Sequence, residues 1–226
     1  MRGRGWAVES PMIKHRIADT FIALTKETDP AKVSVRDVAR TLGVNRKTFY
    51  YHFPSKEILV NWVFRRDLGR RLRDAFPQSA LVFEPRDSSP YAHFPYYVHI
   101  EDEQGRLYHE DFFLLMARCL DARPYLYPAL LKTADLGSLQ AYLFDLYKRA
   151  FEEDILFIFK DVEPGPQALD FMAEFYAAAF IGQVVRRILS PRPCRTIDDI
   201  KPFENIIHGS LYLMRKEMDE LCASPA

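Results

Sequence analysis

One short stretch, residues 34–56 (SVRDVARTLGVNRKTFYYHFPSK), constrains the fold of this chain more than any other. It begins with Ser34, a good helix N-cap, and Asp37 three residues later can complete a capping box. Apolar residues then recur at helical spacing up to Gly43, which supplies the left-handed backbone that ends a helix without steric cost. The stretch therefore predicts two short helices around a tight turn, with a third helix following at once.

The second of these helices is predicted to expose polar and aromatic side chains. Asn45 can cap the helix, and Val44, Phe49 and Phe53 can turn inward. Tyr50 is placed equally well for the core or the surface. The remaining exposed face carries Arg46, Lys47, Thr48, Tyr51 and His52. This is the sequence form of a helix-turn-helix, whose second helix enters the DNA major groove.

Lys56 lies in the first turn of the next helix, where its charge opposes the helix dipole. Helix stability alone does not explain a cation at this position. A nearby phosphate would explain it, because the helix N-terminus and the ammonium would bind the same anion. We therefore expect Lys56 to contact the DNA backbone.

Residues 14–60 resemble the DNA-binding domain of the TetR/AcrR family of bacterial transcriptional regulators. The resemblance rests on an amphipathic first helix (residues 15–26), VSVRDVARTLGV, the K-T-F-Y-Y-H-F recognition helix and the P-S-K-E-I-L entry to a fourth helix. It implies an all-α fold, with a helix-turn-helix head and a larger C-terminal domain for ligand binding and dimerisation. It also implies a sequence-specific DNA-binding regulator, usually a repressor.

The resemblance assigns roles to individual residues of the head. Arg36 matches a residue that reaches a base edge, and arginine suits the paired acceptors of guanine. Arg46 and Lys47 open the recognition helix, where family members read bases. The positions that contact phosphate, sugar or a thymine methyl are those of Thr48, Tyr50, Tyr51 and His52, and Lys56 matches a phosphate-binding lysine. The family often has a small residue or proline where Lys47 stands, so a guanine-rich or phosphate-heavy half-site is indicated.

Charge is distributed unevenly along the chain, although the net charge is zero. Residues 1–73 hold 16 basic and 7 acidic residues, a balance of +9, and residues 74–226 carry the compensating −9. A basic end supplies the non-specific, salt-sensitive part of DNA affinity. An acidic remainder should face away from DNA, so charge supports a head that meets nucleic acid.

The predicted organisation is a flexible basic arm at 1–10, a helix-turn-helix domain at 11–56, a linking helix at 57–76 and an effector-binding and dimerisation domain at 77–226. Prolines mark residues 77–95 as a linker or irregular loop. Residues 96–109 are either a hairpin or an extended loop. Helical patterns follow at 111–121, 124–134, 138–159, 166–189 and 197–221.

The last two helical patterns indicate a partner. From sequence alone, both helices could belong to the core of one subunit. The resemblance implies instead a homodimer in which these helices pack against their twins and set two recognition helices about 34–36 Å apart. The expected interface residues are Ala177, Phe180, Val184, Ile207, Ser210 and Met214.

Aromatic residues of the C-terminal part are candidates for an effector pocket, although such stripes are more often plain core. The candidates are Phe113, Met116, Tyr147 and Phe175. The resemblance implies a small effector, and the lining suits an apolar or aromatic molecule that releases the repressor from its operator. The alternative is a regulator without an effector, or one that depends on a partner protein, as a coactivator does. Its partner surface would then be the acidic, proline-rich stretch 77–111.

Other function classes find little support. No nucleophile signature or phosphate-binding loop occurs, so no enzymatic activity and no cofactor are expected. His93, His99 and His109 put no obvious trio on one helix face, so no metal site is expected. Three scattered cysteines indicate a reducing cytoplasm. The N-terminus lacks the apolar core of a signal peptide, and no apolar run approaches the length of a membrane span.

Overall fold

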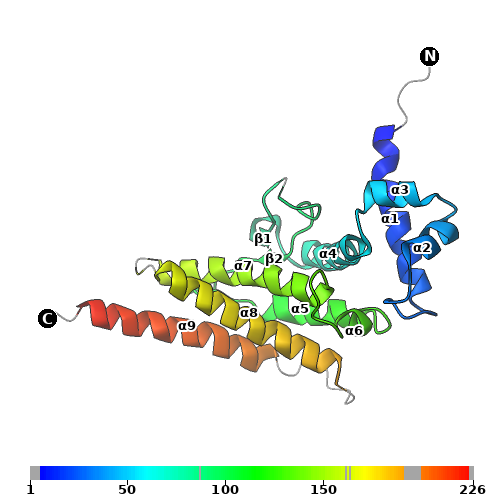
Figure 1. The fold of residues 1–226 in the computed structure, drawn as a ribbon. Helices are drawn as coiled ribbons and strands as arrows, with labels where there is room; N and C mark the ends of the chain where they lie inside the picture. Colours follow the sequence, from blue (N-terminus) through cyan, green and yellow to red (C-terminus); the bar gives the residue numbers. More distant parts are fainter. Residues whose placement is uncertain (1–5, 87, 161, 163, 191–199, 224–226) are drawn as a thin grey trace.

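The computed structural model describes residues 6–86, 88–160, 162, 164–190 and 200–223. Helices dominate this part of the chain, as the sequence predicts. They are α1 (Trp6–Leu24), α2 (Val35–Leu42), α3 (Arg46–His52), α4 (Lys56–Ala75), α5 (Glu110–Asp121), α6 (Tyr127–Leu130), α7 (Leu139–Phe159), α8 (Pro166–Ile188) and α9 (Ile200–Ala223). Figure 1 shows α1–α3, the head, at one end of an elongated molecule, and α7, α8 and α9 lying lengthwise beyond α4.

Local signals set the ends of the head helices. The Ser34 hydroxyl accepts a hydrogen bond from the Asp37 backbone N–H at 3.2 Å, and the Ser34 N–H donates to the Asp37 carboxylate at 3.1 Å. Gly43 has a φ of +75°, the left-handed conformation that closes α2. The Asn45 side chain accepts from the Thr48 N–H at 2.7 Å and so begins α3. The expected caps are confirmed.

Part of the flexible arm predicted at residues 1–10 is helical. Helix α1 begins at Trp6, so residues 6–10, which the sequence assigns to a flexible arm, are helical. Residues 1–5 lie outside the described part of the chain. Helix α6 is shorter than predicted: residues 127–130 of the predicted segment 124–134 form it.

Residues 77–109 form a packed segment rather than a free linker. A one-turn 3-10 helix (Gln78–Ala80) leads into β1 (Leu81–Val82), which pairs antiparallel with β2 (Tyr97–Val98). The expected hairpin partner of β2 at 106–109 instead contributes an isolated bridge between Glu101 and Leu107. Residues 96–109, for which the sequence allowed a hairpin or an extended loop, therefore contain β2 and a bridged turn. The partner of β2 is β1, which begins 16 residues earlier in the chain.

A buried arginine fastens this segment to the helices. Arg65 of α4 is fully buried, and its guanidinium donates to the Glu84 carboxylate at 2.5 Å, the Tyr142 hydroxyl at 2.8 Å and the Phe94 carbonyl at 2.6 Å. Buried charges require such pairing, because an unpaired charge in a low-dielectric interior is costly. Arg65 therefore joins α4, the irregular segment and α7.

Helix α8 is apolar on more than one side. Helix α8 is long enough and apolar enough to cross a membrane, by length and composition alone. The sequence had led us to expect no apolar segment of that length. One face packs along α7 and buries Ala173, Ala177 and Ile181. A buried core helix passes the same compositional test, so this finding reflects a core face together with an exposed apolar face.

Candidate nucleic-acid interface and regulatory core

The outer face of α3 carries the residues predicted to meet DNA. Arg46, Lys47 and Tyr51 are exposed, Tyr51 at 81%. Tyr50 is 43% exposed, so it lies at the surface rather than in the core, and the Arg46 guanidinium lies 5.9 Å from the centroid of its ring. Thr48 is half-buried, where its hydroxyl donates to Asn45 at 3.0 Å.

Buried aromatic side chains hold this face in position. Phe49 of α3 and the C-cap residue Phe53 are almost fully buried beneath it. Phe53 packs edge-on against Trp62 of α4, with ring centroids 5.7 Å apart, and Trp62 packs in turn against Phe94 at 5.5 Å. We call residues 77–223 the body and its first part, residues 77–109, the irregular segment. Trp62 therefore contacts both the end of the recognition helix and the irregular segment. His52, half-buried beside Tyr51, completes the α3 face.

Arg36 is exposed on α2, the helix that packs against α3. The nearby Arg40 is held by Asp37 at 2.9 Å. Among the described ion pairs there is none to Arg36. The guanidinium of Arg36 is therefore the better placed of the two for an external acceptor.

The structure gives Lys56 a role that the sequence prediction missed. Its ammonium donates to the carbonyls of Pro30, Ala31 and Val33, at 3.1, 2.9 and 3.2 Å. An ammonium has three N–H donors, so a phosphate would have to displace one of these carbonyls. Lys56 therefore ties the loop between α1 and α2 to the start of α4, and this explains a cation there without DNA.

The predicted effector residues do not form a pocket together. Phe113, Met116 and Tyr147 are buried, and the ring of Phe180 packs on Phe113 and Tyr147 with centroids 5.0 and 5.3 Å away. Phe175 is wrong as a pocket residue, because it is 57% exposed on the outside of α8. None of these four residues lines one of the three cavities described in the structure.

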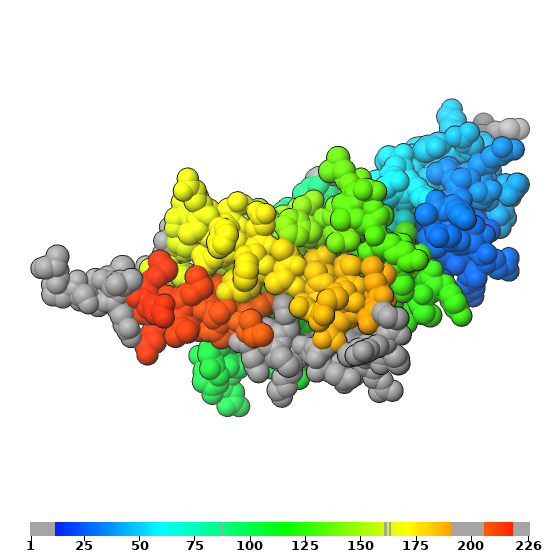
Figure 2. Space-filling view, turned by 60° about the horizontal axis from the view of Figure 1, so that its bottom comes forward, coloured from blue at the N-terminus to red at the C-terminus, as the bar shows by residue number. Residues whose placement is uncertain are grey.

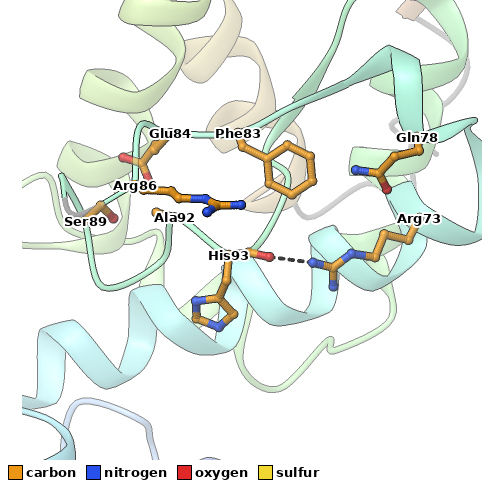
Figure 3. A pocket seen from close by; sticks show the side chains of 8 residues that line it. All are labelled: Arg73, Gln78, Phe83, Glu84, Arg86, Ser89, Ala92 and His93. Atoms are coloured by element: carbon orange, nitrogen blue, oxygen red, sulfur yellow. Dashed lines mark hydrogen bonds between the residues drawn. The ribbon is translucent and has the colours of Figure 1, made fainter.

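The largest of those cavities, of about 720 Å³, lies between the end of α4 and the irregular segment. Figure 3 shows its lining, in which the Arg73 guanidinium donates to the His93 carbonyl. The lining residues are Arg73, Gln78, Phe83, Glu84, Arg86, Ser89, Ala92 and His93. This polar and cationic lining differs from the apolar, aromatic lining that the sequence led us to expect.

Most of the predicted dimer residues face inward. Ala177, Phe180, Val184 and Ile207 are buried within the subunit, which corrects their assignment to an interface. Ser210 is half-buried and hydrogen-bonds the Tyr176 hydroxyl at 2.7 Å, so it links α9 to α8. Among the six, Met214 is exposed, at 37%.

A different face of the same helices is exposed and apolar. On α8 and its C-cap it carries Phe171, Phe175, Ala178, Gly182 and Leu189, and on α9 it carries Ile206, Gly209, Leu213 and Met214. We call this set the exposed stripe. Its α8 members recur every three or four residues or a multiple of that, as on one face of a helix. Figure 2 shows α8 and α9 side by side at the surface.

A buried polar cluster in the body was not anticipated. His109 at the start of α5, Asp154 on α7 and His208 on α9 bring their ligand atoms within 4.8 Å of one another. The sequence prediction considered His109 only with its neighbours in the chain. Pairing across 45 and 99 residues leaves no local spacing signal, so only the folded chain reveals this group.

Sequence comparison with known proteins finds matches in the head and the start of α4. The model of the bacterial regulatory proteins of the tetR family matches residues 18–63. An uncharacterized HTH-type transcriptional regulator of Mycobacterium tuberculosis is 30% identical over 89 residues, covering 38% of this chain and 44% of that protein. The HTH-type dhaKLM operon transcriptional activator DhaS of Lactococcus lactis is 33% identical over 58 residues, covering 26% of this chain and 31% of that protein. The chain thus spans less than half the length of these curated relatives.

Solved structures extend the likeness to the body. The dihydroxyacetone kinase operon activator DhaS superposes with a TM-score of 0.55 at 17% identity, covering 88% of this chain and 96% of that one. A TetR transcriptional regulator from Rhodococcus sp. RHA1 gives 0.51 at 20% identity, covering 88% and 98%. At such identities the likeness shows the fold alone. The relatives are regulators, in agreement with the prediction that the chain is not an enzyme. The chain is thus similar to the tetR family of bacterial regulatory proteins over residues 18–63, and it shares an all-α fold with solved regulators.

Proposed function

We propose that the protein is a homodimeric, sequence-specific DNA-binding transcriptional regulator that represses its targets until a small molecule releases it. The observation that carries this proposal is the α3 face. Arg46, Lys47 and Tyr51 point outward at the end of the molecule, on a buried base of Phe49 and Phe53. A short helix held rigidly in this way fits the major groove. A regulator of this kind acts on chromosomal DNA, so we place it in the cytoplasm.

The contacts divide by type. Arg46 and Arg36 are assigned to base edges, because arginine can donate two hydrogen bonds to guanine. Lys47 is assigned to a base edge or a phosphate. Thr48, Tyr50, Tyr51 and His52 are assigned to phosphate and sugar. Contacts of the second kind position a protein on the duplex, whereas contacts to bases specify the sequence.

The homodimer would form through the exposed stripe. Along α8, the large apolar Phe171, Phe175 and Leu189 flank the small Ala178 and Gly182. Small residues allow two helix backbones to approach closely, and large exposed apolar patches mark interaction surfaces. A two-fold axis through this stripe would hold two heads about one DNA turn apart.

A second candidate function is a regulator that needs no small apolar effector and works alone or with a partner protein. The packing of Phe113, Met116 and Tyr147 favours it, because these residues fill the interior that an apolar ligand would need. The similar protein DhaS is named an activator. Screening compounds for release from DNA separates the two candidates, since only the first predicts a hit.

Selection of bound sequences from a random DNA pool tests the proposal. The purified full chain should enrich a palindromic site. The variant Arg46→Ala should enrich a site with a relaxed preference at particular base pairs, whereas Arg118→Ala, at an exposed arginine on α5 of the body, should enrich the wild-type site. Failure of the folded protein to enrich any site at low salt would contradict sequence-specific binding.

A further inference from the structure

We propose that His109, Asp154 and His208 form a binding site for one divalent transition-metal ion, with zinc as the first candidate. The site lies where α5, α7 and α9 meet. All three side chains are buried, and none belongs to the predicted DNA-binding face. Two imidazoles and a carboxylate are a ligand set suited to zinc and other first-row metals.

The distances fit an ion. His109 Nδ1 lies 3.2 Å from His208 Nε2, and Asp154 Oδ2 lies 3.8 and 3.9 Å from these two atoms. The point equidistant from three atoms so spaced is about 2.1 Å from each, within the range of zinc bonds to nitrogen and oxygen. A metal can therefore be accommodated with little movement of the side chains.

Supporting contacts orient two of the ligands. His109 Nε2 lies 2.9 Å from the Val98 carbonyl. Because a carbonyl only accepts hydrogen bonds, Nε2 carries the proton and Nδ1 presents its lone pair to the cluster. The Tyr97 hydroxyl donates to Asp154 Oδ2 at 2.8 Å. Metal ligands are commonly held by such outer contacts.

Three protein ligands leave a coordination position open for a water or a further ligand.

The cluster has a second explanation without metal. His208 Nε2–H can donate to His109 Nδ1 across the 3.2 Å gap, which would make the group a hydrogen-bonded core. In that arrangement a proton occupies the place of the ion. The two explanations differ in a measurable way, because only the first predicts saturable binding of one ion per chain.

Metal binding would also bear on regulation, and this consequence rests on the proposed function. The ion would fasten α9, which carries part of the exposed stripe, to α5 and α7. Helix α5 packs on α4, whose Trp62 contacts the end of the recognition helix. The ion is thus placed to favour one arrangement of the two heads over another, which is what an effector must do.

Direct titration tests the site. Full-length protein, freed of tags and treated with chelator, is titrated with zinc by calorimetry and with Co²⁺ by visible absorption. We expect one ion per chain and Co²⁺ bands typical of nitrogen and oxygen ligands. Millimolar Mg²⁺ should not compete, because it prefers oxygen ligands alone. Thiolate charge-transfer bands would overturn the proposal, since they would place the ion on cysteine.

Matched variants complete the test. Asp154→Asn and His208→Gln should each weaken zinc binding about 100-fold or more, and Tyr97→Phe, which removes only a supporting hydroxyl, about 10-fold. His93→Gln, an exposed histidine outside the cluster, should leave binding unchanged. Circular dichroism checks that each variant is folded. Lack of saturable micromolar binding by the folded wild type, or binding that survives in both ligand variants, would overturn the site. DNA affinity is measured separately, so a site that binds zinc without affecting DNA contradicts only the regulatory consequence.

Discussion

The head and the body of this molecule are organised by contacts of different range. In the head, helix ends are set by residues three positions apart, such as Ser34 with Asp37 and Asn45 with Thr48. The body is fixed to α4 by side chains far apart in sequence, as in the contacts of Arg65 with Glu84 and Tyr142. Short-range signals can be read along a chain, whereas contacts across dozens of residues cannot.

The two regions also differ at their surfaces. The outer face of the head carries cations and tyrosines, and the outer face of α8 and α9 carries large apolar side chains with small ones between them. The first kind of surface suits a polyanion, and the second suits another apolar surface. Substitutions on the head surface should therefore affect DNA binding, whereas substitutions on the α8 and α9 surface should affect association of the protein.

The largest effect is expected from the buried ion pair between Arg65 of α4 and Glu84 of the body. Arg65→Met removes the cation and leaves the buried Glu84 carboxylate with the more distant Arg149, at 3.5 Å. Breaking a buried pair by removing one partner costs about 3–5 kcal/mol. Urea denaturation should show this loss, whereas Arg118→Met on the exposed side of α5 should change stability little. Equal stabilities of the two variants would show that Arg65 does not organise the body.

The next effect concerns assembly. Leu213→Glu places a carboxylate in the exposed stripe and should weaken dimerisation by about 100-fold or more, because an unpaired charge would be desolvated at the contact. Sedimentation over a range of concentrations measures the change. Leu136→Glu, at an exposed leucine between α6 and α7, should leave the dimer intact. A dimer insensitive to Leu213→Glu would place the interface elsewhere.

In the head, Arg46→Ala should cost about 1–3 kcal/mol of binding at particular base pairs and relax the preference there. Lys47→Ala should weaken all sequences alike if Lys47 meets phosphate, and it should lower the salt slope by about one. Binding to a panel of single-base variants of the selected site distinguishes these outcomes. An equal loss of affinity for every site variant in Arg46→Ala would show that Arg46 does not read bases.

Lys56 decides between two explanations. Lys56→Met removes three charged hydrogen bonds to the loop between α1 and α2, so it should lower the stability of the head by about 1–2 kcal/mol. The salt dependence of DNA binding should then stay the same. A salt slope lowered by about one, with unchanged stability, would instead support the phosphate contact predicted from sequence.

The smallest effect is local. Ser34→Ala removes the N-cap of α2 and should destabilise the head by about 1 kcal/mol. Hydrogen bonds from Ser34 also hold the pKa of Asp37 below its usual value of 3.8. A lowered folded-state pKa adds stability above the unfolded pKa, and this is lost as the pH falls through the folded value. The difference between wild type and Ser34→Ala should therefore shrink below about pH 4, measured by thermal unfolding.

The exposed stripe shows why one sequence expectation was wrong. Helix α8 is apolar on both sides, so its periodicity indicates a helix without stating which side meets the core. Ala177 and Phe180 appeared suitable for an interface, yet α7 covers their side and leaves Phe171 and Phe175 outside. Only the packing of α7 on α8 resolves this choice.

The helical class, the two-helix turn, its caps and the outward face of α3 could all be predicted from residues 34–56. These features depend on backbone conformation and on side chains within one or two helical turns, which a linear pattern records. The place of Lys56, the packed segment at 77–109, the exposed stripe and the meeting of His109, Asp154 and His208 were decided by tertiary structure. Each of these depends on which surfaces the chain buries against one another, and residue spacing carries no record of that.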